Sequence, residues 1–305
     1  MSDDALLHEL EPTVETLLER HLDSTKEWFP HEHVPYERGR ETHGEWSAAD
    51  ADLGGASIDD GVRSSLIVNL LTEDNLPYYF RTIERSFGTA GAWGAWVRRW
   101  TAEEGRHSMA IYGYLMVTRA VDPVALERAR MAQVSGGVAP EPGSPADVIV
   151  YVTLQELATR IAHRNTGLVI GDPAGYAVMM RVAADENLHH LFYRDLVSAA
   201  IALDPSTMVQ AVERQVVGFE MPGTGIPGFA KHAASIAKAG VYDLAIHHEQ
   251  ILVPVVLHHW GIESLEGLDA DAEQARDRLM SRLEKSGRVA RRVAERKDEL
   301  ASVLV

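Results

Sequence analysis

Apolar residues recur at positions i, i+3, i+4 and i+7 in almost every long segment of the chain. This spacing places them on one face of an α-helix, and the two-residue alternation typical of β-strands is nearly absent. The pattern therefore predicts an all-α protein. With 305 residues the chain can bury a large core without disulfide bonds, so we expect one helical domain over residues 1–305.

Turn and capping residues divide this pattern into separate helices. A first amphipathic helix is expected from Asp3 to Ser24, followed by a loop rich in Pro and Gly up to residue 57. A core bundle over about residues 58–203 should contain four long helices, at roughly 58–87, 89–119, 145–169 and 173–203. Residues 204–305 should add flanking helices, including one at about 229–260 and a highly charged, solvated helix from 266 onward.

Ionisable side chains interrupt the apolar stripe of two of the four central helices. Glu104 and His107 do so in the second, and Glu186 and His189 do so in the fourth. Residues three apart share a helix face, so each Glu-x-x-His pair can present a carboxylate and an imidazole to one metal ion.

The other two central helices each contribute one inward carboxylate, Glu73 and Glu156. These two are 83 residues apart, and Glu104 and Glu186 are 82 apart, so the two helix pairs look like pseudo-repeats. Tight turns at Gly88 and Gly171 should make each pair antiparallel, with a longer connection at 135–145 between the pairs. Two single Glu residues plus two Glu-x-x-His motifs form the ligand set of ferritin-like carboxylate bundles that bind two metals.

Charge balance supports a metal site. Four buried, unpaired carboxylates would each cost several kcal/mol, roughly, whereas two divalent cations would neutralise them. The chain has no cysteine, which excludes disulfides, thiolate zinc sites and protein-ligated iron–sulfur clusters. Carboxylates combined with imidazoles suit iron or manganese, since zinc needs fewer ligands and calcium does not need histidine.

Several neighbouring groups have less specific patterns. Glu103, Asp74 and Asp185 adjoin the predicted ligands but turn about 100° away on the helix, so we expect them around the site or at the surface. Eight further histidines lack a matching carboxylate pattern and are predicted to be surface, capping or core residues: His31, His33, His163, His190, His247, His248, His258 and His259. Of these, His163 lies two turns after Glu156 on the same face.

Four motifs give the sequence a family resemblance. They are Leu71-Thr-Glu-Asp-Asn-Leu-Pro77, Trp100-Thr-Ala-Glu-Glu-Gly-Arg-His107, Gln155-Glu-Leu-Ala-Thr-Arg-Ile-Ala-His-Arg-Asn-Thr166 and Ala183-Ala-Asp-Glu-Asn-Leu-His189. Around the six metal-binding positions, these segments resemble soluble acyl-[acyl-carrier-protein] desaturases, the stearoyl type of plant plastids and its actinobacterial relatives. Few other di-iron bundles share the Gln-Glu-x-Ala-Thr string.

The resemblance implies an O₂-dependent enzyme with two iron ions, which removes two hydrogens from a carrier-bound acyl chain and leaves a cis double bond. An apolar channel would select the reacting methylene. Thr159 resembles a family threonine beside the oxygen-binding face that passes protons. Asp185 is expected to hydrogen-bond His107, and Trp28 resembles a tryptophan on the proposed electron route.

The resemblance also implies partners: an acyl carrier protein, a ferredoxin as electron donor, and a second copy in a homodimer. Both partner proteins are acidic, so we expect a basic docking surface at Arg81, Arg85, Arg98 and Arg99, with the Arg-rich tail as the alternative. The net charge of −16 argues against binding to nucleic acid or anionic membranes. An acidic N-terminus and the lack of a long apolar run suggest a cytoplasmic location.

Gly105 departs from the family pattern, which has Asn there; a helical glycine suggests close approach of another backbone or an altered partner surface. Two alternative functions stay open. The first is a di-iron oxygenase, such as a hydroxylase or N-oxygenase, acting on another carrier-bound or free substrate. The second is a metal-binding homologue without catalysis.

Overall fold

The computed structural model describes residues 1–40, 44–137 and 143–303. Within these ranges the secondary structure is helical, without strands, as predicted. The α-helices are α1 (Asp3–Ser24), α2 (Asp60–Glu73), α3 (Leu76–Phe87), α4 (Gly91–Thr118), α5 (Pro123–Gly136), α6 (Pro145–Val169), α7 (Pro173–Leu203), α8 (Pro205–Val217), α9 (Phe229–Lys238), α10 (Leu244–His247) and α11 (Ala270–Val303). A π-helix, η4 (His248–His259), continues directly from α10.

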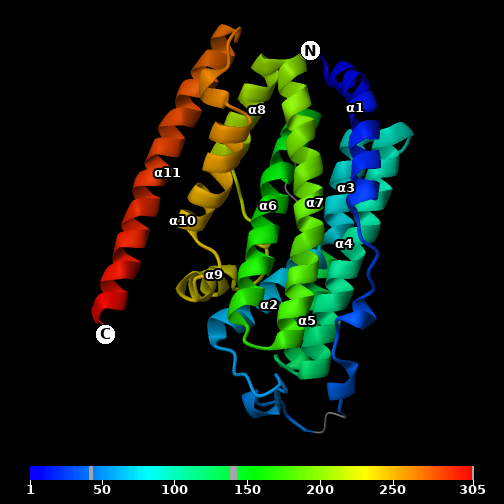
Figure 1. Ribbon diagram of the computed structural model, residues 1–305, viewed down its shortest axis with the longest axis vertical. Coiled ribbons are helices and arrows are strands. Elements are labelled where there is room, and N and C mark those ends of the chain that lie inside the picture. Colours follow the sequence, from blue (N-terminus) through cyan, green and yellow to red (C-terminus); the bar gives the residue numbers. More distant parts are fainter. Residues whose placement is uncertain (41–43, 138–142, 304–305) are drawn as a thin grey trace.

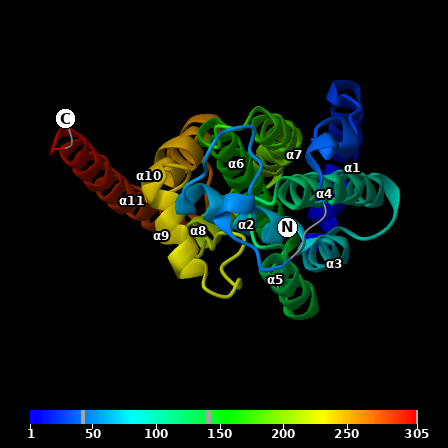
Figure 2. The same ribbon diagram turned by 90° about the horizontal axis from the view of Figure 1, so that it is seen from below.

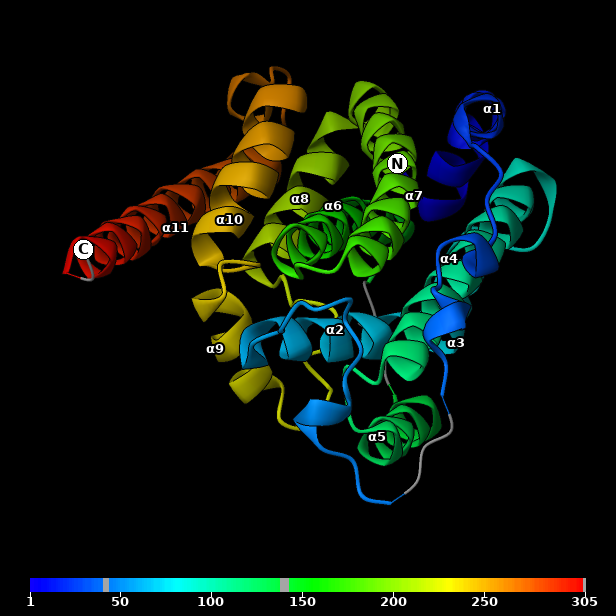
Figure 3. The same cartoon turned by 60° about the horizontal axis from the view of Figure 1, so that its bottom comes forward.

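The antiparallel pair α6 and α7 occupies the centre of the molecule (Figure 1). Helices α1, α3 and α4 lie on one side of this pair, and α8 to α11 lie on the other (Figure 2). Helix α2 packs under the bundle against α4 and α6, with α9 and α5 beside it (Figure 3). The predicted all-α bundle with flanking helices is confirmed.

The predicted helix at 58–87 is wrong in one respect: it is broken into α2 and α3. Helix α2 ends at Glu73, and α3 begins at Leu76 with Pro77 in its first turn. Proline has no N–H to donate and disfavours helical geometry at the residue before it, so one helix cannot run through unchanged. The break leaves Glu73 at the end of α2.

The predicted helix at 229–260 is also interrupted. Helix α9 ends at Lys238, and Gly240 adopts a left-handed backbone with φ of 73°. Glycine takes this conformation without steric cost and commonly ends helices. Asp243 then caps α10 by accepting a hydrogen bond from the backbone N–H of Ile246. Helix α5 was not predicted, and residues 138–142 of the expected connection lie outside the described residues.

The N-terminal helix has the predicted bounds and docks on α4 and α7. Ser2 caps it, and its buried face presents Leu17 and His21 to the bundle. At the other edge of the molecule, α11 buries a stripe that includes Leu279 and Leu283 and exposes most of its charges, as expected of a surface helix. Among the described residues, no helix is long and apolar enough to cross a membrane.

The expected close approach of another backbone to Gly105 is not found in the described part of the chain. A Cβ atom built at Gly105 would meet no heavy atom within 4 Å outside its own helix backbone, so no neighbouring backbone in the described part of the chain approaches it. The close approach does occur one turn inside α4, at Gly94, where a Cβ would lie 2.2 Å from the carbonyl oxygen of Thr89.

Candidate metal centre

Six predicted side chains converge inside the bundle. They come from α2 (Glu73), α4 (Glu104 and His107), α6 (Glu156) and α7 (Glu186 and His189), and all six are buried. Their ligand atoms form two sets, each with all atoms within 4.8 Å of one another. One set is Glu73, Glu104, His107 and Glu186; the other is Glu104, Glu156, Glu186 and His189. Glu104 and Glu186 belong to both sets, so the residues present would be able to hold two metal ions, with these two carboxylates available to either ion.

The same nitrogen of each imidazole faces the carboxylates. His107 Nδ1 lies 3.6 Å from Glu73 Oε2, 3.4 Å from Glu104 Oε2 and 3.5 Å from Glu186 Oε1. His189 Nδ1 lies 2.9 Å from Glu104 Oε1 and 3.7 Å from Glu156 Oε2. Each ring therefore turns one nitrogen toward the cluster and leaves Nε2 for another partner.

Several polar atoms of this cluster lie close to one another but make no well-aligned hydrogen bond within the described residues: Glu104 Oε1, Glu156 Oε2, Glu186 Oε2, His107 Nδ1 and His189 Nδ1. Buried polar atoms are normally paired, and an unpaired set that points into one space calls for an ion. Metal cations fit this donor set, because carboxylates and neutral imidazoles suit a divalent first-row metal.

The carboxyl pKa values show the same excess of negative charge. Burial, together with Glu186 and Glu104, raises the pKa of Glu156 well above its usual range. Burial and Glu186 also raise the pKa of Glu104. Burial opposes ionisation of Glu186 too, but the nearby imidazoles of His107 and His163 outweigh burial and lower the pKa of Glu186. Divalent cations would remove the repulsion that keeps protons on the other two.

A second carboxylate stands behind each imidazole. Asp185 Oδ2 lies 3.5 Å from His107 Nε2, and Glu103 Oε2 lies 3.0 Å from His189 Nε2. Each acidic residue directly precedes the Glu of one Glu-x-x-His motif and contacts the His of the other. Asp185 is thus the neighbour of His107, but the expected hydrogen bond between them is not formed at 3.5 Å. The third acidic candidate, Asp74, instead pairs with Arg130 of α5 at 2.6 Å.

Trp28 lies directly beside Asp185. Its indole N–H donates to Asp185 Oδ2 at 2.8 Å, and its side chain is buried. The guanidinium groups of Arg106 and Arg181 lie over the ring, 4.9 Å and 5.4 Å from its centre. Burial opposes ionisation of Asp185, but the contact with His107 outweighs burial and lowers the pKa of Asp185 to about 2. Trp28, Asp185 and His107 thus form a buried line toward the cluster.

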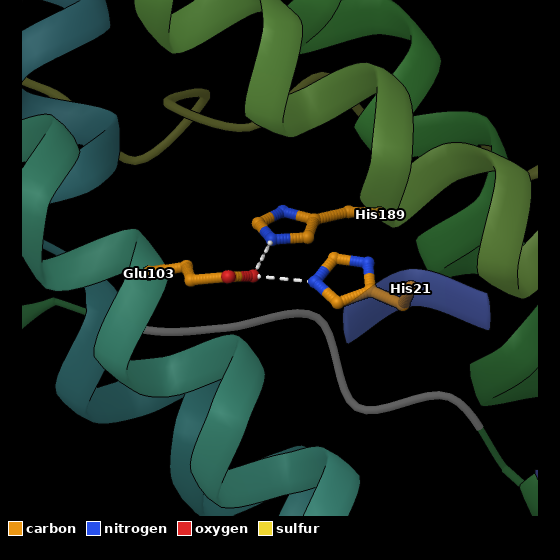
Figure 4. Close-up of side chains that lie close together, drawn as sticks. All are labelled: His21, Glu103 and His189. Atoms are coloured by element: carbon orange, nitrogen blue, oxygen red, sulfur yellow. Dashed lines mark hydrogen bonds and ion pairs between the residues drawn. The ribbon is translucent and has the colours of Figure 1, made fainter. Parts of the chain in front are cut away.

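Two histidines near the cluster were not predicted as site residues. His163 Nε2 lies 2.9 Å from Glu73 Oε1 and 3.5 Å from Glu186 Oε1, and its position two turns after Glu156 was the available signal. His21 of α1 contacts Glu103 (Figure 4). No sequence spacing relates His21 to the motifs. His190 is a core residue, whose Nδ1 contacts the carbonyl oxygen of Thr153 at 2.9 Å.

A cavity of about 710 Å³ adjoins the cluster on the side of α2 and α6. Its inner wall includes Asn69, Thr159 and His163, and its largely apolar remainder is formed by α8 to α11 and η4. The Thr159 hydroxyl donates to the carbonyl oxygens of Gln155 at 3.2 Å and Glu156 at 3.1 Å. Exposed basic side chains line the outer end: Lys238, Arg282 and Lys285.

The predicted docking arginines lie at the α3–α4 turn. Arg81, Arg85 and Arg98 are exposed. Arg99 is half-buried and pairs with Glu103, so it belongs to the surroundings of the cluster.

Comparison with known proteins gives one consistent match. A family model described as fatty acid desaturase matches residues 2–303. DesA1 of Mycobacterium tuberculosis strain H37Rv, named as an acyl-[acyl-carrier-protein] desaturase, is 42% identical over 287 residues, covering 92% of this chain and 84% of that protein. The chloroplastic acyl-[acyl-carrier-protein] desaturase 6 of Oryza sativa subsp. japonica is 31% identical over 262 residues, covering 79% of this chain and 62% of that protein.

A solved structure shares the fold. The X-ray structure of the acyl-ACP desaturase DesA2 from Mycobacterium tuberculosis H37Rv matches with a TM-score of 0.69 at 26% identity. The match covers 89% of this chain and 99% of that one.

Proposed function

The chain belongs to the fatty acid desaturase family, and on that premise we propose that it introduces a cis double bond into an acyl chain carried by acyl carrier protein. The observation that carries this proposal is the pair of ligand sets sharing Glu104 and Glu186 beside an apolar cavity. The ligands are the six residues of those sets: Glu73, Glu104, His107, Glu156, Glu186 and His189. The metal is proposed to be iron, with O₂ as co-substrate.

When bound, the two iron ions supply O₂ activation and the abstraction of hydrogen from an unactivated methylene. The protein's own contribution is to place that methylene. The acyl chain would extend from the outer end of the cavity to the wall formed by Asn69, Thr159 and His163. Of these wall residues, His163 contacts Glu73 and Glu186 of the cluster. The apolar wall excludes water and fixes how far the chain can enter.

Thr159 is proposed to hold a proton near the oxygen-binding side of the cluster. It follows Glu156 by one turn, and its hydroxyl lies in the wall of the cavity while donating to backbone carbonyls. A hydroxyl can donate and accept at the same time, so Thr159 can receive a hydrogen bond from a group in the cavity without losing its own.

Electrons are proposed to arrive from ferredoxin through Trp28 and Asp185 to His107. The half-buried Arg106 and Arg181 beside Trp28 offer positive charge to an acidic donor at the outer end of this line. The carrier protein, also acidic, is proposed to dock where Lys238, Arg282 and Lys285 surround the outer end of the cavity. We further propose that the enzyme is a cytoplasmic homodimer.

The experiment that tests the function is mass spectrometry of acyl-carrier-protein substrates of several chain lengths after incubation with the iron-loaded protein, ferredoxin, its reductase and O₂. Loss of two hydrogen atoms from the acyl chain is the expected result. Gain of an oxygen atom would instead indicate a hydroxylase. No change with any chain length, from protein that holds its iron, would contradict catalysis on these substrates.

A further inference from the structure

In each half of the metal centre an acidic residue lies behind the histidine, and a ring from the N-terminal segment hydrogen-bonds to that acidic residue. The ring is an indole in one half and an imidazole in the other. On one side the line is Trp28, Asp185 and His107; on the other it is His21, Glu103 and His189. Both outer residues come from the N-terminal segment, His21 from the last turn of α1 and Trp28 from the loop after it. The motif repeat relates the acidic residues to each other, but it contains no counterpart of His21.

The His21 side is the tighter of the two. His21 Nε2 lies 2.8 Å from Glu103 Oε2, and His189 Nε2 lies 3.0 Å from the same oxygen. Both imidazoles point at this one carboxylate (Figure 4). His21 is 4% exposed and Glu103 is 2% exposed, so water cannot readily replace either partner. The ring of His21 also packs edge-on against Trp96, with 5.0 Å between centres.

Glu103 accepts hydrogen bonds from both rings. The guanidinium groups of Arg99 and Arg106 lie against the same carboxylate, which favours its ionised form. An ionised carboxylate only accepts hydrogen bonds, so each Nε2 carries the hydrogen it donates. This commits His189 Nε2 to Glu103 and fixes which nitrogen of His189 faces the metal-binding carboxylates.

The alternative role for this trio is a third metal site, because ligand atoms of His21, Glu103 and His189 lie within 4.8 Å of one another. The surroundings oppose it. Arg99 forms an ion pair with Glu103, and Arg106 lies 3.7 Å from the same carboxylate. Two guanidinium groups already neutralise Glu103, and they would repel a further cation in a buried site.

From this geometry we propose that His21 is a positioning residue for the metal ligand His189. By anchoring Glu103, it fixes the tautomer and the ring orientation of His189, and it makes the docking of helix α1 part of one half of the metal centre. Outer hydrogen-bond partners of metal ligands typically change metal affinity or activity by roughly 10- to 100-fold when removed. The inference rests on the metal centre proposed above and assigns it a residue outside the family motifs.

The test uses the iron-loaded full chain and three variants. His21→Leu removes the hydrogen bond, and His21→Gln keeps an amide that can donate to Glu103. Leu17→Ala is the matched control, because Leu17 lies one turn earlier on the same buried face of α1 and supplies packing but no hydrogen bond. Two properties are measured: the rate of iron release to a chelator, and the Mössbauer spectrum of the diferrous protein.

His21→Leu should release one iron roughly 10- to 100-fold faster and should alter the signal of one of the two irons. His21→Gln should restore most of both properties, and Leu17→Ala should leave them close to those of the unmodified protein. Equal effects in Leu17→Ala and His21→Leu, unchanged release in His21→Leu, or a third bound iron would each overturn the inference. If the unmodified protein bound no iron, the metal centre itself would be refuted instead.

Discussion

Glu104 of α4 and Glu186 of α7 face each other across the bundle and belong to both sets of converging side chains. Every other member of the cluster belongs to one set only. Loss of a shared carboxylate should therefore disturb both metal positions, whereas loss of Glu73 or Glu156 should mainly disturb one. Comparing the metal content of these variants therefore distinguishes two metals that depend on the same two carboxylates from two independent metal sites.

The two glycines of α4 should respond oppositely to alanine. Gly105→Ala should raise the free energy of unfolding by about 0.5–1 kcal/mol, because alanine favours the helix and its Cβ would meet no atom within 4 Å. Gly94→Ala should lower it, because its Cβ would collide with Thr89. Denaturant unfolding of both variants measures the difference. Destabilisation by Gly105→Ala would indicate a contact that the described part of the chain does not contain.

Charge reversal can decide where the carrier protein docks. Lys238→Glu combined with Lys285→Glu should raise KM for a carrier-bound substrate several-fold and leave kcat nearly unchanged, since both residues lie at the outer end of the cavity. The control is Arg81→Glu combined with Arg85→Glu at the exposed α3–α4 turn. A KM increase confined to the control pair would move the docking site to that turn.

His247 should make the protein sensitive to acid. Burial, with a contribution from His248, lowers its pKa to about 4, while Phe219 stacks on the ring with 4.8 Å between centres. A histidine with a lowered pKa in the folded state gives stability that is complete above about pH 6.5 and is lost as pH falls through about 4. Between neutral pH and a pH below about 4, this difference in pKa lowers the free energy of unfolding by on the order of 3 kcal/mol.

His247→Gln should therefore flatten the fall in unfolding free energy between neutral and acid pH, as measured by chemical denaturation across that range. His8→Gln, on the exposed face of α1, serves as the control and should leave the profile as it is. A profile for His247→Gln that matches the unmodified protein would mean that His247 is not protonated on acid unfolding.

Trp28 should matter for electron delivery rather than for metal binding. Trp28→Phe keeps an aromatic side chain but loses the indole N–H that donates to Asp185. Reduction by ferredoxin should therefore slow by roughly tenfold or more, while the iron content stays the same. Stopped-flow reduction by ferredoxin, compared with reduction by dithionite, separates the route from the site. Trp46→Phe is the matched control, because its indole N–H donates to the backbone carbonyl oxygen of Arg119 and not to a partner of a proposed metal ligand. Equal rates in the two variants would contradict the proposed route.

The sequence predicted what depends on helix periodicity. Glu104, His107, Glu186 and His189 were visible because charges in an apolar stripe are conspicuous, and the near-equal spacing to Glu73 and Glu156 related the two halves. The bounds of α1 and of the central helices followed from local capping and turn residues, except where Pro77 and Gly240 interrupt a helix.

Contacts between distant segments could not be predicted in this way. The pairing of His21 with Glu103 depends on how α1 docks against α4. The contact of His163 with Glu73 depends on how α2 crosses α6. The cavity is closed by α9, η4 and α11, whose packing has no local signal. Propensity and periodicity describe one helix at a time, whereas these features arise from tertiary packing.

The most direct test of the metal centre is the iron content and absorption spectrum of aerobic protein, unmodified and carrying Glu104→Ala. We predict two irons per chain, an oxo-bridged diferric absorption, and loss of that absorption with most of the iron in the variant, because Glu104 belongs to both ligand sets. Full iron content with an unchanged spectrum in Glu104→Ala would contradict the proposed centre.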